Sequence, residues 1–214
     1  MLKQLKFVMA LSASALFLAG CSSPKDANET NFKKAIQAYF DTRPNSFCFE
    51  PDSMEYPVTI QHKDNGRQYE IDQQDVLVQA GYLTRSDLVI DIPSTFGESG
   101  MKNTPVYRYE LTPEGEKAFS PRTAPLGQRG FCLGKIVVGK VTNFTKPLDV
   151  PGMTFSKVQY EYQIQDLPDW ATSPAASKGF SMLVYDIKKT RGEAQLVLTN
   201  NGWVHKELLR NYTR

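Results

Sequence analysis

Few side chains in this 214-residue chain belong to the types that carry out catalysis or bind metals. The chain has three cysteines and two histidines, His62 and His205, which are far apart in the sequence. A structural zinc site takes four nitrogen or sulfur ligands, so this set nearly excludes one. The motifs GxSxG, HExxH, GxxxxGK[ST] and GxGxxG, each typical of a class of enzyme or nucleotide-binding protein, do not occur. The sequence therefore predicts a protein that is not an enzyme and needs neither cofactor nor metal, with both histidines at the surface or hydrogen-bonded.

The first twenty residues have the pattern of an export signal. Two lysines precede an uncharged and mostly apolar run at residues 7–20. A helix of this length spans about 21 Å, less than the roughly 30 Å hydrocarbon core of a bilayer. A secretory signal peptide at residues 1–20 fits this run better than a membrane-spanning helix.

The end of this run resembles the lipobox of bacterial lipoproteins. Residues 18–21 are Leu-Ala-Gly-Cys, and the resemblance implies cleavage before Cys21 and acylation of its sulfur and its new amino group. Several acyl chains anchor a protein stably, so membrane lipid is the first expected partner. Ser22 stands where an aspartate is the usual signal for retention at the inner membrane. The resemblance therefore implies the outer membrane, with a body facing the periplasm favoured over a surface-exposed one.

Residues 21–28 follow as a lipidated tether. Beyond Cys21 they are polar and include one proline, so we expect a flexible segment. Seven flexible residues reach only about 15 Å, which keeps the folded body close to the membrane. The whole chain is similar to predicted envelope lipoproteins without an assigned role, so the resemblance implies an anchor but supplies no activity.

Export also bears on the two other cysteines. With Cys21 acylated, Cys48 and Cys132 remain in an oxidising compartment, and only one pairing is possible. A redox-active pair is more often a CxxC motif, which is absent. We therefore expect a structural disulfide that pins the end of the first helix to the start of the second half.

The first half of the exported chain, residues 29–127, combines helical and extended patterns. Apolar residues at helical spacing predict a helix over 29–41. A second helix is expected over 72–83, with Asp72 as its N-cap and Gly81 at its C-terminal end. After a charged stretch at 84–104 come a strand at 106–111 and a short helix beginning at Pro113. The order of VLVQAGYL and YRYELTPEGEKAF resembles the helix-then-wing segment of winged-helix proteins.

Charge argues against nucleic acid as the partner of this segment. Residues 73–120 carry seven acids and four bases, whereas a DNA-binding surface needs several Lys or Arg against the phosphates. An exported chain also meets no chromosome. We expect the winged-helix-like segment to be a scaffold or a protein-contact surface.

The second half, residues 128–214, has the period-two pattern of strands. Alternating runs predict strands near 136–141, 158–164, 180–187 and 195–198, and Asn200-Asn201-Gly202 predicts a tight turn. Short connections between such strands favour an antiparallel sheet. The expected fold class is α+β, with a helical N-terminal half and an antiparallel β half.

Several residues of the second half are candidates for partner contact. Trp170 lies in a proline-bounded loop and is expected to be exposed. Lys188, Lys189 and Arg191 form a basic cluster at a predicted hairpin tip, which suits anionic lipid headgroups or peptidoglycan, although a solvated turn is the favoured interpretation. Tyr160, Tyr162, Trp170 and Trp203 either line a ligand groove or, as period-two aromatics more often do, belong to the core of the sheet.

Charge also differs between the halves. Residues 21–127 carry 11 bases and 16 acids, and residues 128–214 carry 12 bases and 7 acids. Opposite signs allow the halves to dock or one face to meet a charged partner, although solvated surfaces with no particular use are the favoured interpretation. We expect a non-catalytic, outer-membrane-anchored lipoprotein that presents an α+β body to a protein or cell-wall partner. Two alternatives stay open: a cell-wall hydrolase or modifying enzyme with a carboxylate pair, and a small-ligand-binding lipoprotein.

Overall fold

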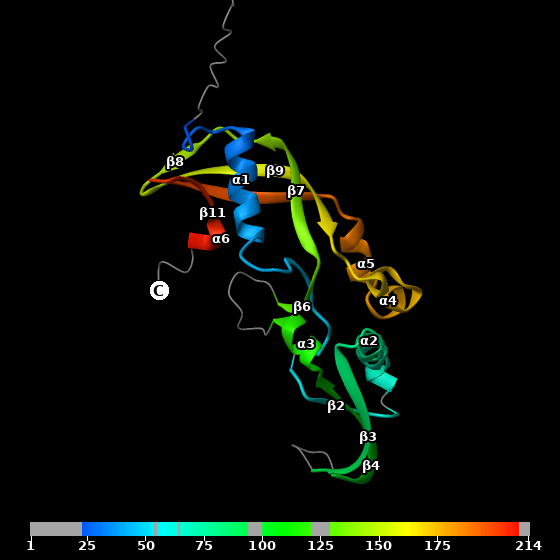
Figure 1. Ribbon diagram of the computed structural model, residues 1–214. Helices are drawn as coiled ribbons and strands as arrows, with labels where there is room; N and C mark the ends of the chain where they lie inside the picture. Colours follow the sequence, from blue (N-terminus) through cyan, green and yellow to red (C-terminus); the bar gives the residue numbers. More distant parts are fainter. Residues whose placement is uncertain (1–22, 54, 64, 94–99, 121–128, 210–214) are drawn as a thin grey trace, which may run out of the picture.

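The structure, a computed structural model, describes residues 23–53, 55–63, 65–93, 100–120 and 129–209 (Figure 1). The predicted signal peptide and Cys21 lie outside the described residues. The described residues form both helices and antiparallel sheets, which confirms the α+β fold class. The helices are α1 (Glu29–Phe40), α2 (Gln68–Gln79), α3 (Pro113–Ala118), α4 (Pro174–Gly179), α5 (Ser181–Lys188) and α6 (Lys206–Leu209), with 3-10 turns η1 (Asn65–Arg67) and η3 (Asp169–Thr172). The strands are β1 (Phe47–Phe49), β2 (Val58–Gln61), β3 (Leu83–Ile92), β4 (Met101–Leu111), β5 (Phe119–Ser120), β6 (Gly130–Leu133), β7 (Lys135–Phe144), β8 (Leu148–Val150), β9 (Met153–Gln165), β10 (Arg191–Thr199) and β11 (Gly202–His205).

The larger sheet has the strand order β11-β10-β9-β7, with β8 added to β9, and α1 covers one of its faces (Figure 1). The helix predicted over 29–41 is confirmed, and Asn28 caps it by accepting a hydrogen bond from the backbone N–H of Asn31 at 2.9 Å. Phe32 lies edge-on against Phe144 and Trp203 in the core. The core between helix and sheet consists of Phe32, Ala35, Ile36, Phe40, Ile136, Val138, Val141, Val158, Tyr160, Ala194, Leu196 and Trp203.

The smaller sheet has the order β2-β4-β3 and packs against α2. The stretch 84–104, which the sequence marks only as charged, contributes most of β3 and the start of β4, and the two strands pair along almost their whole length. Figure 1 shows this hairpin projecting at the end of the molecule opposite to α1. The strand expected at 106–111 and the helix beginning at Pro113 are both present, within β4 and as α3.

The second helix, α2, starts at Gln68, four residues earlier than predicted. Asp72 is therefore not its N-cap; its carboxylate forms an ion pair with Lys178 at 2.8 Å and accepts a hydrogen bond from Gln68. The hydrogen bond from Lys178 lowers the pKa of Asp72. Gly81 does follow the helix with a φ of +81°, as its position predicts.

Residues 180–187 do not form the predicted strand. Apart from Phe180 they belong to the helix α5. Phe180 and Leu183 are buried and Ile187 is partly buried, which is a helical spacing, while Met182 and Tyr185 are exposed. Residues 182–185 are consecutive apolar side chains, and such a run fits a strand as well as a helix as long as burial is unknown.

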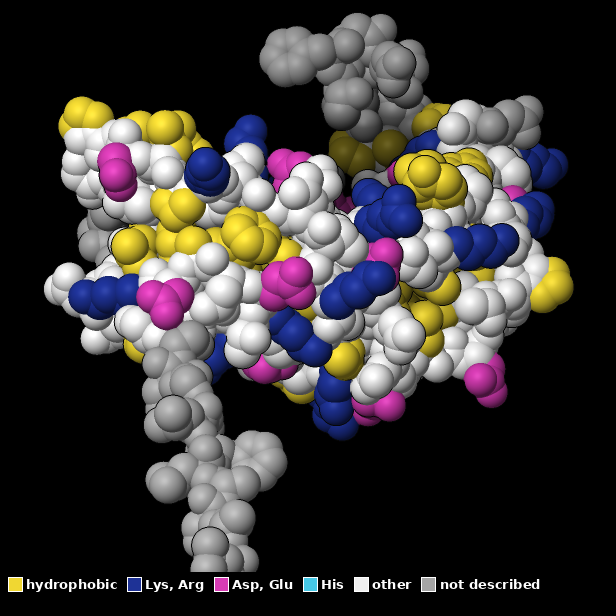
Figure 2. Space-filling model, turned by 90° about the horizontal axis from the view of Figure 1, so that it is seen from above, with side chains coloured by type: hydrophobic (Ala, Val, Ile, Leu, Met, Phe, Trp, Pro, Cys, Tyr) yellow, Lys and Arg dark blue, Asp and Glu magenta, His cyan; other side chains and the backbone are white. Residues whose placement is uncertain are grey.

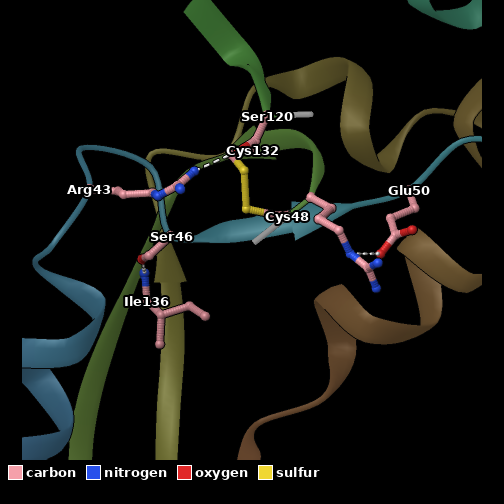
Figure 3. The surroundings of a disulfide bond; sticks show 8 residues. Arg43, Ser46, Cys48, Glu50, Ser120, Cys132 and Ile136 are labelled. Atoms are coloured by element: carbon pink, nitrogen blue, oxygen red, sulfur yellow. Dashed lines mark hydrogen bonds and ion pairs between the residues drawn. A yellow bond between two sulfur atoms is a disulfide. The ribbon is translucent and has the colours of Figure 1, made fainter. Parts of the chain in front are cut away.

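A three-stranded sheet, β1-β6-β5, joins the two larger parts of the fold, and it contains the predicted disulfide (Figure 3). Cys48 and Cys132 face each other in the β1–β6 pair and are bonded, with an S–S distance of 2.06 Å. Arg43 donates a hydrogen bond to the hydroxyl of Ser120 at 2.7 Å beside the bridge. The disulfide prediction is confirmed.

Candidate functional site

The described chain begins with a segment that is hydrogen-bonded to the folded body. The side chain of Asn31 donates to the backbone carbonyls of Ser23, at 2.8 Å, and Asp26, at 2.9 Å. The indole N–H of Trp203 donates to the carbonyl of Lys25 at 3.0 Å. Residues 23–28 are therefore part of the body and not the flexible tether that their polarity predicted.

Gly202 makes room for this segment. Its φ is +117°, and a Cβ there would lie only 2.7 Å from the carbonyl oxygen of Pro24. A glycine at the β10–β11 turn thus allows both the turn and the close approach of the N-terminal segment. Because Ser23 is held in place, the predicted acylation site at Cys21 is separated from the body by Ser22 alone.

The basic cluster of the second half does not form a hairpin tip. Lys188 is the last residue of α5, Lys189 follows it, and Arg191 is the first residue of β10, opposite Glu161 of β9. Glu161 lies 3.8 Å from Arg191 and 3.6 Å from Lys140. The positive charge of Arg191 is therefore partly balanced by a neighbouring carboxylate.

Two shallow hollows lie beside this cluster. The larger, about 620 Å³, is lined by Thr142, Asn143, Gln159, Tyr160, Lys189, Arg191, Gly192 and Glu193. The smaller, about 360 Å³, is lined by Gly139, Lys140, Glu161, Tyr162, Gln163 and Thr190. Both hollows are open and lined mainly by polar side chains. Lys189 and Arg191 both line the larger one, so the structure brings these two residues together on one surface.

Trp170 points inward instead of toward solvent. Its ring lies against Phe49 and Tyr82, with ring centroids 6.0 and 5.9 Å apart, and its indole nitrogen is buried. It packs where η3 meets the β1-β6-β5 sheet, so the expected exposure of Trp170 is wrong. Lys188, Lys189 and Arg191 lie elsewhere, between the last residue of α5 and the first residue of β10.

The other aromatic candidates divide between core and surface. Tyr160 and Trp203 are buried beneath α1, and burial raises the pKa of Tyr160. Tyr162 is half-buried and lines the smaller hollow. The period-two aromatics are thus mainly core residues and do not form a continuous ligand groove.

Both histidines stack on a tyrosine. His62 lies over Tyr107, with 4.0 Å between ring centroids, and its Nε2 is 3.3 Å from a carboxylate oxygen of Asp87. His205 is stacked on Tyr39 at 4.0 Å, and burial lowers its pKa. Among the described residues no group of three or more His, Cys, Asp or Glu side chains is arranged to hold a metal ion.

The most exposed apolar surface of the smaller sheet is the outer part of the β3–β4 hairpin. Its base is fixed to α2, because Arg85 and Tyr109 both bind the carboxylate of Asp75, at 2.9 and 3.0 Å. Beyond the base, residues 84–91 of β3 are exposed without interruption. The exposed apolar side chains are Leu88 (38%), Val89 (64%), Ile90 (37%) and Met101 (45%).

Comparisons with known proteins give no further information on this surface. No protein-family model matches the chain, and no curated protein or solved structure is significantly similar to it. In the part of the chain that the structure describes, none of the helices has the length and hydrophobicity required to span a bilayer.

Proposed function

We propose that this protein is a non-catalytic outer-membrane lipoprotein, anchored through acylated Cys21, whose β3–β4 hairpin binds a protein partner in the envelope. The lipobox at residues 18–21 supports the anchor. The exposed apolar edge of the hairpin supports the binding role, and it is the single observation on which that role depends.

Strand β3 is an edge strand, because the smaller sheet has the order β2-β4-β3. Among the residues that the structure describes, one side of its backbone therefore has no neighbouring strand in that sheet. A long edge strand with exposed apolar residues invites pairing with another chain, and proteins usually shorten, charge or cover such strands. Here β3 runs for ten residues, and its exposed stretch includes Leu88, Val89 and Ile90. An extended segment of a partner, added beside β3, would satisfy both its backbone groups and its apolar side chains.

The position of the hairpin fits a protein that is attached at its other end. Figure 1 shows the described N-terminus beside the larger sheet and the β3–β4 hairpin at the opposite end of the molecule. Anchoring through Cys21 then directs the hairpin away from the membrane, toward proteins that do not lie in the same bilayer.

The two alternatives have less support. Glu161, the acid of the smaller hollow, lies beside Lys140 and Arg191, as expected of a surface ion pair. A ligand groove built from sheet aromatics requires Tyr160 and Trp203 to be accessible, and both are buried. The larger hollow is polar and open, unlike the mostly apolar pockets that enclose small ligands.

The anchor and the binding surface are tested separately. Cys21→Ala should move the protein from the membrane to the soluble fraction, and a protein that stays with membranes would contradict lipid anchoring at this residue. A photo-crosslinking amino acid in place of Val89 should yield one defined crosslinked species in intact cells, which Leu88→Asp/Ile90→Asp abolishes. The control is the same amino acid in place of Tyr69, an exposed side chain on α2. Equal crosslinking at both positions would argue against a binding site on the hairpin.

A further inference from the structure

A second exposed apolar hairpin lies at the end of the molecule where the described chain begins. In the β8–β9 hairpin, Leu148 pairs with Phe155 and Val150 pairs with Met153. Directly paired residues of an antiparallel ladder share a face, and residues two apart along a strand do so as well. These four apolar side chains therefore form one face of the hairpin.

The other face of the hairpin is polar. Asp149 pairs with Thr154, whose hydroxyl donates a hydrogen bond to the Asp149 carboxylate. The hairpin is thus amphipathic, and its apolar face is not covered by α1. Leu148 is 53% exposed, Met153 is 41% exposed and Val150 is 37% exposed. Such a face is costly in water unless something apolar covers it.

Strand register places this hairpin next to the N-terminal segment. Val197 of β10 pairs with Phe155 of β9, and Thr199 pairs with Gly202, so the β8–β9 and β10–β11 turns lie at the same end of the sheet. Pro24 packs against Gly202 at this end. Figure 1 also shows β8 beside the described N-terminus.

The anchor must enter the membrane close to this surface. Cys21 precedes Ser23 by two residues, which extend over at most about 7 Å. Ser23 itself is held by Asn31. Figure 2 looks onto this end of the molecule and shows hydrophobic side chains gathered over its left part, the side on which β8 lies in Figure 1, with most Lys and Arg further to the right. Lys25, Lys146 and Lys157 are exposed near the hairpin, where anionic headgroups would attract them.

We propose that the β8–β9 hairpin lies in the membrane interface beside acylated Cys21, with Leu148, Val150 and Met153 among the outer segments of the lipids. This inference rests on the lipid anchor proposed above. The acyl chains and the hairpin then form two contacts with the bilayer, and two contacts fix the orientation of the body where one leaves it free to turn. The β3–β4 hairpin is held away from the membrane as a result.

The test uses the mature, acylated protein in vesicles of phosphatidylethanolamine and phosphatidylglycerol. Leu148→Cys introduces the one free thiol of the mature protein, since Cys21 is acylated and Cys48 is bonded to Cys132. An environment-sensitive fluorophore on that thiol is then exposed to lipids with brominated acyl chains, which quench by contact. The matched control is Val89→Cys on the opposite hairpin, where the native side chain is 64% exposed. Met153→Cys repeats the measurement, so that one misfolded variant does not decide the result.

Because interfacial side chains enter the bilayer by only 5–10 Å, we expect labels at 148 and 153 to lose about half of their fluorescence and the label at 89 almost none. Absence of quenching at 148 and 153 in an acylated protein would overturn the inference and leave the anchor standing. Equal quenching at 89 would overturn the orientation. Energy transfer between differently labelled copies, without quenching, would mean that a second copy covers the hairpin, and would also overturn it. An unmodified Cys21 in the mass spectrum would remove the proposed anchor and this inference together.

Discussion

Removing the disulfide with Cys48→Ala/Cys132→Ala is expected to lower the free energy of unfolding by about 4.5 kcal/mol. The two cysteines are 84 positions apart, and closing a loop of this length restricts the unfolded chain by that amount in the chain-entropy model. The folded state should change little, because Phe47 and Leu133, which flank the bridge, stay paired through the backbone of β1 and β6. The expected loss of stability therefore comes from the greater conformational freedom of the unfolded chain.

The short strands around the bridge explain why the fold depends on the free energy that the disulfide contributes. The sheet β1-β6-β5 that contains the bridge has strands of only three, four and two residues. Such short strands are marginal without added support. Cys132 is buried, so its truncation to alanine adds a packing loss of at most about 1 kcal/mol. Reduction of the wild-type bridge leaves both sulfur atoms in place and separates the two contributions.

Urea unfolding of the mature chain carrying Cys21→Ala measures the effect. With a slope of roughly 2.5 kcal/mol per molar urea, the midpoint should fall by about 2 M. Reduction of the parent protein should produce nearly the same fall and should leave the double variant unchanged. A shift below about 0.5 M would refute the reasoning, since the two ends of the loop would then already be close in the unfolded chain.

Two further predictions concern single positions in the larger sheet. Gly192→Ala should destabilise the protein by about 1–3 kcal/mol, because a Cβ there would lie 2.5 Å from Cζ of the Tyr160 ring. The matched control is Gly139→Ala, where the nearest contact of the new Cβ would be at 3.4 Å. Equal losses of stability in thermal unfolding of the two variants would contradict this explanation. Burial lowers the pKa of His205, so the unfolded chain takes up a proton first as the pH falls. The contribution of neutral His205 to the free energy of unfolding is then fully present above about pH 6.5. It declines below that pH, by at most about 1.4 kcal/mol per pH unit. His205→Asn should flatten this decline and Tyr39→Phe should keep it; a decline that survives His205→Asn would assign it to another group.

The parts of the fold that the sequence predicts are those with strong local signals. The helical spacing of Phe32, Ile36 and Phe40 gives α1, and Asn200-Asn201-Gly202 gives the β10–β11 turn. The cysteines allow one pairing once Cys21 is set aside, and the disulfide follows. Each of these patterns lies within a short window or depends on simple counting, so tertiary contacts were not needed.

The errors arise where tertiary burial decides the structure. The run Ser181–Lys188 contains four consecutive apolar residues, which fit a strand as well as a helix, yet the packing of Leu183 and the exposure of Met182 and Tyr185 fit a helix. The predicted cap Asp72 is instead bound by Lys178, a residue more than a hundred positions away. Residues 23–28 are polar and therefore resemble a flexible linker in the sequence. In the structure Ser23 and Asp26 hydrogen-bond to each other, and Asn31 and Trp203 bind the segment to the body, which the polarity of the segment does not reveal.

The candidate surfaces show the same limit. Lys189 and Arg191 are recognisable as a basic cluster, but their neighbour Glu161 is supplied by β9. Trp170 is missed as an interior residue because Phe49 and Tyr82, which cover it, come from the other half of the chain. Neither exposed hairpin stands out in the sequence, since apolar residues in strands are expected to be buried.

The two apolar hairpins can be distinguished because they lie at opposite ends of one body. Val89 and Leu148 belong to different sheets, and only the Leu148 hairpin adjoins the docked N-terminal segment. If lipid covers the β8–β9 hairpin and protein covers the β3–β4 hairpin, each position is the negative control for the other. A probe at 148 should respond to brominated lipid and give no protein crosslink, and a probe at 89 should do the reverse. A single partner covering both ends would have to span the length of the molecule, and it would make both probes respond alike.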